Sequence, residues 1–117
     1  MDIRAKNVRL RVYIGEDKRH GDKPLYEAIV LKARQLQLAG ATVVFGRLGY
    51  GRLTRLHTTQ VVFSEDLPVI VEIVDSEDRI QNFMPLLAGL GEIGLVSCDE
   101  VRVLLRPLHS GQKPSLT

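Results

Sequence analysis

Residues Asn7–Ile14 read NVRLRVYI, in which apolar and polar side chains alternate without a break. A period of two is typical of a β-strand that buries one face in a core. The two sets are Val8, Leu10, Val12 and Ile14 on the expected core face, and Arg9, Arg11 and Tyr13 on the other. The stretch therefore predicts a sheet that is covered on one side only.

A polar loop from Gly15 to Asp22 leads from this strand into the first predicted helix. Pro24 suits the first turn of a helix, and Asp22 lies close to the N-cap position. The helix is predicted to end near Ala39, with Gly40 as its C-cap residue. Its expected buried stripe is Leu25, Ile29, Ala33 and Leu36.

Three more strands are predicted downstream of this helix. Ala41–Phe45 is the second strand, and Val69–Val74, opened by Pro68, is the third. Proline is compatible with the first position of a strand. The fourth strand is expected where Val101, Val103 and Leu105 alternate with other residues.

A second helix is predicted after the third strand, with Ser76 as a suitable N-cap. Its apolar residues recur at helical spacing and are Ile80, Phe83, Met84 and Leu87. Pro85 lies inside this pattern, so we expect a kink or an early end there. Gly89, Gly91 and Gly94 then predict a flexible turn before the fourth strand.

The element order βαββαβ predicts an α+β fold, the ferredoxin-like plait. This is a four-stranded antiparallel sheet with two helices on one face and with the first and third strands at its centre. We expect a single domain over residues 1–117, with a core from about residue 7 to residue 106. Residues 107–117 are expected to form a flexible tail.

The open face of this sheet is predicted to carry partnered charges. Glu72 is expected beside Arg9 or Arg11, and charges are tolerated under cover only when they are partnered. We interpret the face as an oligomer interface; a solvated face is the alternative. Only Tyr13 offers an aromatic ring on the central strands, so a base-stacking platform for RNA is not expected. The predicted face also includes Ile70, Val74, Arg102, Leu104 and Arg106.

Composition excludes several classes of protein. The net charge is +2, which argues against nucleic acid as the main partner. The sequence has no apolar run near the roughly 20 residues of a membrane span, and the first residues lack the apolar stretch of a signal peptide. The single cysteine, Cys98, has no surrounding motif and is expected to be a packed or strand-start residue, not a nucleophile. We expect a cytoplasmic protein without membrane insertion.

Residues Gly46–His57 read GRLGYGRLTRLH and combine glycines with arginines. A hairpin connection normally needs about two to five residues, so this segment is long, and long loops in compact domains are often functional. Glycine permits close approach of a ligand to the backbone, and arginine suits phosphate or carboxylate groups. The segment is a candidate anion-binding or partner-binding loop; a plain solvated loop is the alternative.

Four stretches resemble one family closely: Gly15-Glu16, PLYEAIV at 24–30, GATV at 40–43 and SEDLPVIVEIVD at 64–75. The chain is similar, from Val8 to Leu105, to the uncharacterised PII-like family catalogued as domain of unknown function 190. The resemblance implies a signalling homotrimer whose sheets face inward. It also implies an adenine nucleotide such as AMP, ADP or ATP in the clefts between subunits.

The same resemblance implies that loop 47–59 reaches a partner protein, such as a membrane transporter or channel. The ligand site it implies comprises Gly46, Arg47, Gly49, Tyr50, Gly51, Gly89, Gly91 and Arg106. Arg55 and His57, expected where the loop returns to the sheet, are further candidates for this site. The chain departs from PII proteins in its longer first loop, with Lys18, Arg19 and His20, and in a glycine turn that contains Glu92 and no lysine. These differences leave open a mononucleotide, a dinucleotide, a cyclic nucleotide or another small anion.

The sequence contains no recognisable nucleophile–base pair, carboxylate dyad or zinc pattern, so we do not expect an enzyme. His20, His57 and His109 are too scattered in sequence to predict a metal site. The alternative is a small ferredoxin-like enzyme acting on a nucleotide or small anion in the same cleft. In that case His57 is the candidate acid or base.

Overall fold

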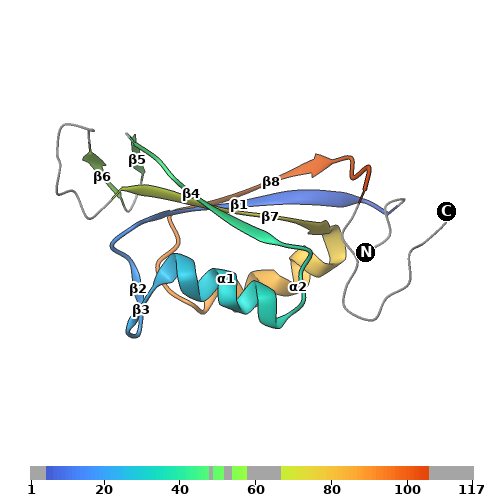
Figure 1. The fold of residues 1–117 in the computed structure, drawn as a ribbon, viewed down its shortest axis with the longest axis horizontal. Coiled ribbons are helices and arrows are strands. Elements are labelled where there is room, and N and C mark those ends of the chain that lie inside the picture. Colours follow the sequence, from blue (N-terminus) through green and yellow to red (C-terminus); the bar gives the residue numbers. More distant parts are fainter. Residues whose placement is uncertain (1–4, 48, 52–53, 58–66, 106–117) are drawn as a thin grey trace.

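The computed structural model describes residues 5–47, 49–51, 54–57 and 67–105. Both helices lie on one face of the main sheet (Figure 1). Neither described helix has the length and apolar content needed to span a membrane. The elements are β1 (Asn7–Gly15), β2 (Arg19–His20), β3 (Lys23–Pro24), α1 (Leu25–Gln35), β4 (Ala41–Phe45), β5 (Gly49–Gly51), β6 (Thr54–His57), β7 (Pro68–Ser76), α2 (Glu77–Ala88) and β8 (Leu95–Val101).

The main sheet has the strand order β4-β7-β1-β8, and each neighbouring pair is antiparallel. β1 and β7 occupy its centre, where the register places Arg11 opposite Glu72. The predicted ferredoxin-like plait is confirmed, including the central position of these two strands. Two small sheets, β2–β3 and β5–β6, are added within the connecting segments.

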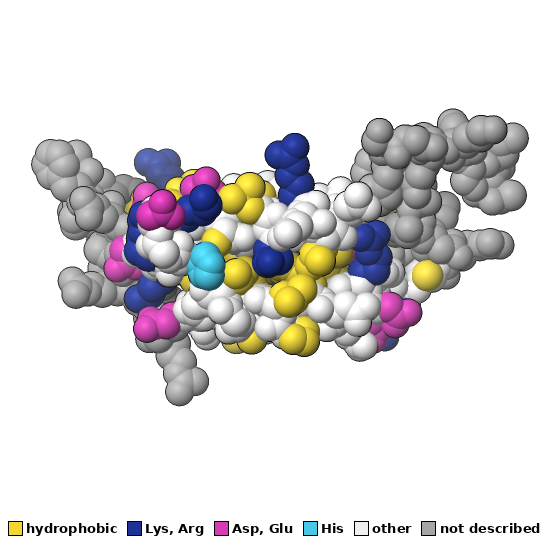
Figure 2. Space-filling model, turned by 90° about the horizontal axis from the view of Figure 1, so that it is seen from below, with side chains coloured by type: hydrophobic (Ala, Val, Ile, Leu, Met, Phe, Trp, Pro, Cys, Tyr) yellow, Lys and Arg dark blue, Asp and Glu magenta, His cyan; other side chains and the backbone are white. Residues whose placement is uncertain are grey.

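The core lies between the sheet and the helices. Alternate residues of β1 and β7 are buried, as the period of two predicts: Val8, Leu10, Val12, Ile14, Val69, Val71 and Ile73. The helices contribute Leu25, Ala28, Ile29, Ala33, Ile80, Phe83 and Leu87. Seen from the helix side, hydrophobic side chains gather along the middle, and most acidic side chains in view lie towards the ends (Figure 2).

α1 is shorter than predicted at both ends. Pro24 is its N-cap residue and Asp22 makes no capping bond; the Leu25 amide instead donates to the Lys18 carbonyl at 2.8 Å. Gln37, and not Gly40, ends the helix in the left-handed region, at φ 59°. The Leu38 and Gln37 amides donate to Ala33 and Arg34, which is the pattern of a Schellman motif. The predicted core residue Leu36 is therefore outside the helix and 38% exposed.

α2 begins as predicted and ends later than expected. The Ser76 hydroxyl accepts a hydrogen bond from the Arg79 amide at 3.4 Å. Pro85 lies inside the helix, but the helix continues to Ala88, so the expected early end is wrong. Leu87, beyond the proline, is 1% exposed. Its burial favours the last turn even though proline removes one backbone donor.

The predicted position of the fourth main strand is wrong. β8 covers Leu95–Val101, and pairing with β1 sets its register, with Tyr13 opposite Leu95. The apolar alternation after Val101 lies beyond the strand, where Leu104 and Leu105 are 78% and 89% exposed. An edge strand that is exposed on both faces lacks the periodic burial that reveals a strand in sequence.

A buried carboxylate joins the two helices. Asp75 is fully buried and accepts hydrogen bonds from the Ala39 amide at 2.9 Å and the Ser76 amide at 2.7 Å. Arg79 lies 3.8 Å from the same carboxylate and donates to the Leu36 and Gln37 carbonyls. This junction ties the end of α1 to the start of α2.

Candidate functional site

Gly46 forms the root of the segment that the sequence singled out. Its amide donates to the Pro68 carbonyl at 2.7 Å, at the point where β4 ends and β7 begins. A Cβ atom at Gly46 would lie 2.7 Å from Cγ of Pro68, and one at Gly49 would lie 3.4 Å from it. The close approach of Pro68 therefore favours glycine at position 46, and the predicted role of Gly46 in ligand binding stays a prediction.

The segment after Gly46 contains a short hairpin. β5 pairs with β6, with Gly49 opposite His57 and Gly51 opposite Thr54. Arg47 is exposed beside it. The side chains of Tyr50, Arg55 and His57 lie outside the described residues, as do the predicted ligand residue Arg106 and the predicted tail at 107–117. The structure thus brings the backbones of the predicted loop residues together without showing their side chains.

The glycine turn is placed against the first loop. Gly89 is the C-cap residue of α2, and a Cβ atom at Gly91 would lie 3.2 Å from Leu25. Nδ1 of His20 lies 2.6 Å from the Leu90 carbonyl, and Nζ of Lys18 lies 3.8 Å from Glu92. The longer first loop therefore packs on the turn. The described atoms nearest to Gly89 belong to α2, and those nearest to Gly91 belong to Leu25 and Arg19.

Glu16 is a further candidate site residue, which is absent from the ligand site that the sequence predicts. Its amide donates to the Leu67 carbonyl at 2.8 Å, so Glu16 lies at the same end of the sheet as Gly46. Oε2 of its carboxylate is buried and has no hydrogen-bond partner among the described atoms. A buried acceptor without a donor is costly, by about 1–3 kcal/mol or more for a charged group.

The open sheet face carries two cross-strand ion pairs. Nε of Arg11 lies 3.1 Å from Glu72, which confirms the expected neighbour of that carboxylate. Arg9 instead binds Asp99 of β8 through Nε and Nη2, at 3.1 and 2.7 Å. The sequence does not predict this pairing, because the predicted fourth strand begins after most of the residues of β8. The predicted Arg102 and Leu104 follow β8 and lie outside the sheet.

Apolar side chains surround these pairs on the open face. Val44 is 50% exposed and Leu95 is 59% exposed, and Ile70, Val74 and Tyr13 are half-buried. The hydrogen bonds from Arg9 hold the pKa of Asp99 below its usual range. The face therefore combines exposed apolar area with charges that already have partners.

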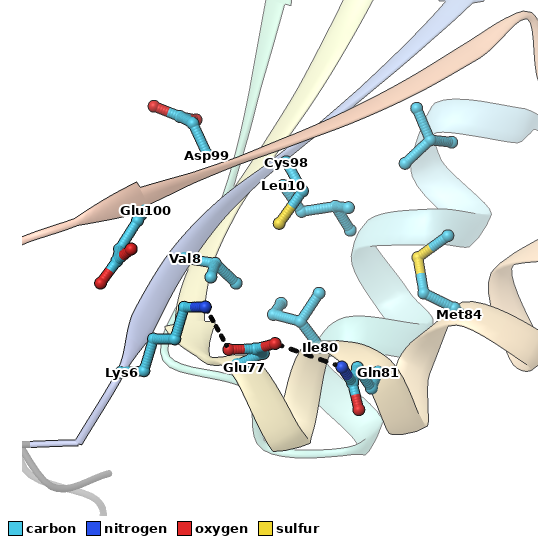
Figure 3. Close-up of a pocket in the computed structure, with 11 residues that line it drawn as sticks. Lys6, Val8, Leu10, Glu77, Ile80, Gln81, Met84, Cys98, Asp99 and Glu100 are labelled. Atoms are coloured by element: carbon cyan, nitrogen blue, oxygen red, sulfur yellow. Dashed lines mark hydrogen bonds and ion pairs between the residues drawn. The ribbon is translucent and has the colours of Figure 1, made fainter.

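A groove between α2 and β8 encloses about 500 Å³ (Figure 3). Its floor is apolar and is lined by Val8, Leu10, Ile80, Met84, Val96 and Cys98. Its rim is formed by charged residues, which are Lys6, Glu77, Asp99 and Glu100. Sequence reasoning missed it because its residues come from three separated segments, one of them the misplaced strand. The groove forms where the edge strand β8 extends above α2.

An ion pair lies at the rim of the groove, and the free thiol of Cys98 lies in its floor. Nζ of Lys6 lies 3.1 Å from Glu77, which also accepts from Gln81 at 3.3 Å. This contact raises the pKa of Lys6. Burial, and next the Asp99 carboxylate, raise the pKa of Cys98, so its reactive thiolate form is disfavoured. In the described part of the chain, no cluster of three His, Cys, Asp or Glu side chains is arranged to bind a metal.

Comparison with known sequences gives one family. Residues 7–103 match the family model of DUF190, described as "Uncharacterized ACR". A UPF0166 protein of Aquifex aeolicus is 32% identical over 101 residues, which cover 86% of this chain and 95% of that protein. A UPF0166 protein of Methanocaldococcus jannaschii is 32% identical over 78 residues, with 67% and 72% covered.

Comparison with solved structures gives the same fold in a distant protein. The structure is CPII, a nitrogen regulatory PII-like protein from Thiomonas intermedia K12, bound to ADP, AMP and bicarbonate. The TM-score is 0.50 at 14% sequence identity, over 84% of this chain and 90% of that one. At this level of identity the similarity establishes a shared PII-like fold.

Proposed function

The chain belongs to the DUF190 family, and from this membership and its PII-like fold we propose that it is a PII-like regulatory module. In this proposal the protein is a homotrimer. It binds an adenine nucleotide or a similar small anion between subunits, and the ligand changes the conformation that residues 47–59 present to a partner protein. The partner is a membrane transporter or channel. Such a mechanism needs a ligand that binds the two conformations with different affinity.

The open sheet face supports the trimer. Val44 and Leu95 leave apolar area in water on the face that carries the Arg11–Glu72 and Arg9–Asp99 pairs. A second copy would cover this area, and the charges would enter the interface with their partners in place. Small domains commonly gain stability by covering such a face.

The orphaned oxygen of Glu16 is the observation that carries the ligand part of the proposal. It lies at the end of the sheet where Gly46 and Leu67 begin and end the long segment. A ribose hydroxyl or an adenine amino group would supply the missing donor, and Arg47, which follows Gly46 in the sequence, is an exposed cation for phosphate. The PII-like fold neighbour was solved with ADP and AMP, which makes adenine nucleotides the first ligands to test.

Thermal-shift titration with AMP, ADP, ATP, cyclic AMP and sodium bicarbonate tests the ligand. A compound that binds the folded state raises the melting temperature by mass action. Arg47→Ala and Glu16→Leu should reduce the shift, whereas Arg34→Ala, an exposed arginine on α1, should not. No shift with any compound, or equal shifts in all variants, would reject this site.

Light scattering after size-exclusion chromatography tests the trimer. Val44→Glu places an unpaired carboxylate on the open face and should dissociate the trimer into monomers. Leu86→Glu is the matched control, because Leu86 is similarly exposed, at 42%, but lies on α2. A parent protein that elutes as a monomer, or a Val44→Glu variant that remains trimeric, would contradict the assembly.

A further inference from the structure

The outer edge of β8 has no partner strand in the described part of the chain. In a strand, alternate residues direct their amide and carbonyl groups to one side, so β8 presents a row of free backbone donors and acceptors at this edge. Such an edge is a template for an added strand. Seven residues, Leu95–Val101, are available for pairing.

The groove runs along this edge on the helix side. The register with β1 places Val96, Cys98 and Glu100 on the same face as the buried Val12, Leu10 and Val8. Figure 3 shows Cys98 on the β8 side of the groove and Ile80 and Met84 on the α2 side. A strand added to β8 would therefore direct every second side chain towards the space between β8 and α2.

The charges at the rim favour a basic partner. Two carboxylates, Glu77 and Glu100, lie on the groove side against a single cation, Lys6, whereas the Asp99 carboxylate binds Arg9 on the open face. Glu77 binds Lys6 directly, whereas Glu100 acts on Lys6 only through space. One end of the groove therefore has excess negative charge.

We propose that the β8 edge and the groove beneath it bind an extended segment of a partner protein, which adds an antiparallel strand to the sheet. The segment places aliphatic side chains between Cys98 and Met84 and a lysine or arginine beside Glu100. The groove opens on the helix side, so it remains accessible when other copies cover the open sheet face. The proposal goes beyond the nucleotide-linked function and does not depend on it.

Synthetic peptides test this inference without nucleotide. The probe is the hexapeptide acetyl-Lys-Thr-Val-Thr-Val-Thr-amide, with variants that carry leucine or isoleucine at the valine positions. In an antiparallel strand, its lysine lies near Glu100 and its aliphatic side chains lie over the groove. Amide chemical shifts from NMR titration should change along β8 and α2, and bound peptide should slow the alkylation of Cys98 by iodoacetamide.

Matched variants separate the proposed mode from simple charge attraction. Glu100→Lys should weaken binding roughly tenfold, as expected for a charge reversal at an interface. Asp78→Lys, the same charge change at an exposed site of α2 outside the groove, should leave binding unchanged. A peptide with N-methyl groups on the pairing edge should fail to bind, because it lacks the backbone donors. The inference is overturned if no peptide of the set shifts β8 resonances, or if the N-methylated peptide binds equally well.

Discussion

Replacing Asp75 by alanine tests whether the carboxylate junction stabilises the fold. Asp75 is fully buried and accepts charge-assisted hydrogen bonds from Ala39 and Ser76. At the lower end of the range for bonds to charged groups, about 1.5 kcal/mol each, their loss amounts to about 3 kcal/mol. Arg79 adds little to this figure, because it is 31% exposed and water screens its 3.8 Å ion pair.

The assay is urea unfolding followed by far-UV circular dichroism, since the chain has no tryptophan. Linear extrapolation gives the free energy of unfolding, and all variants are compared at one protomer concentration because assembly shifts apparent stability. Asp78→Ala is the control: this exposed carboxylate in the first turn of α2 should contribute at most about 1 kcal/mol. If Asp75→Ala loses no more than this control, the reasoning is refuted.

Three further predictions concern the backbone and one ion pair. Gln37→Gly should raise the free energy of unfolding by about 1 kcal/mol, because Gln37 holds φ at 59°; a drop in the urea midpoint would count against this. Gly94→Ala should lower the melting temperature, because its Cβ would lie 2.9 Å from a β1 carbonyl oxygen, whereas Gly40→Ala, with open space around it, should not. Arg9→Gln should raise the pKa of Asp99, as measured by NMR of the carboxyl carbon; an unchanged pKa would contradict the pairing. Because Arg9 depresses the folded-state pKa, its stabilisation is present above the ordinary carboxylate pKa and is lost as pH falls through the folded-state value.

The centre of the sheet could be predicted because burial there has a strict period. Every second residue of β1 and β7 is buried; the β1 sequence alternates accordingly, whereas β7 is recognisable by its nearly continuous apolar run. The edge strand could not be placed in this way, since Ser97–Glu100 are all exposed. The end of α1 was missed for a different reason: Gln37 adopts a conformation that sequence rules assign to glycine, and Arg79 helps to hold it through the Gln37 carbonyl.

The candidate sites show the same division. Gly46 lies at a tight junction with Pro68, where a Cβ atom would clash, and its role in ligand binding stays a prediction. Gly91 lies against Leu25 and Arg19, a contact that the sequence does not predict, and its role as a ligand residue stays a prediction. The groove at Cys98 depends on the register of β8 and on its overhang beyond α2, and neither is encoded in a local pattern of residues.

The two ends of the long segment are both fastened to the central strands. The Gly46 amide donates a hydrogen bond to the Pro68 carbonyl, and the Leu67 carbonyl accepts one from the Glu16 amide. The chain therefore leaves and re-enters the sheet at positions that are held by backbone hydrogen bonds. The residues between these two hydrogen-bonded positions can therefore be exchanged without altering the register of β4 or β7. A chain cut between them should remain one particle, with its two pieces joined by the sheet. The segment can diversify between related proteins, or accept a grafted peptide, independently of the core that displays it.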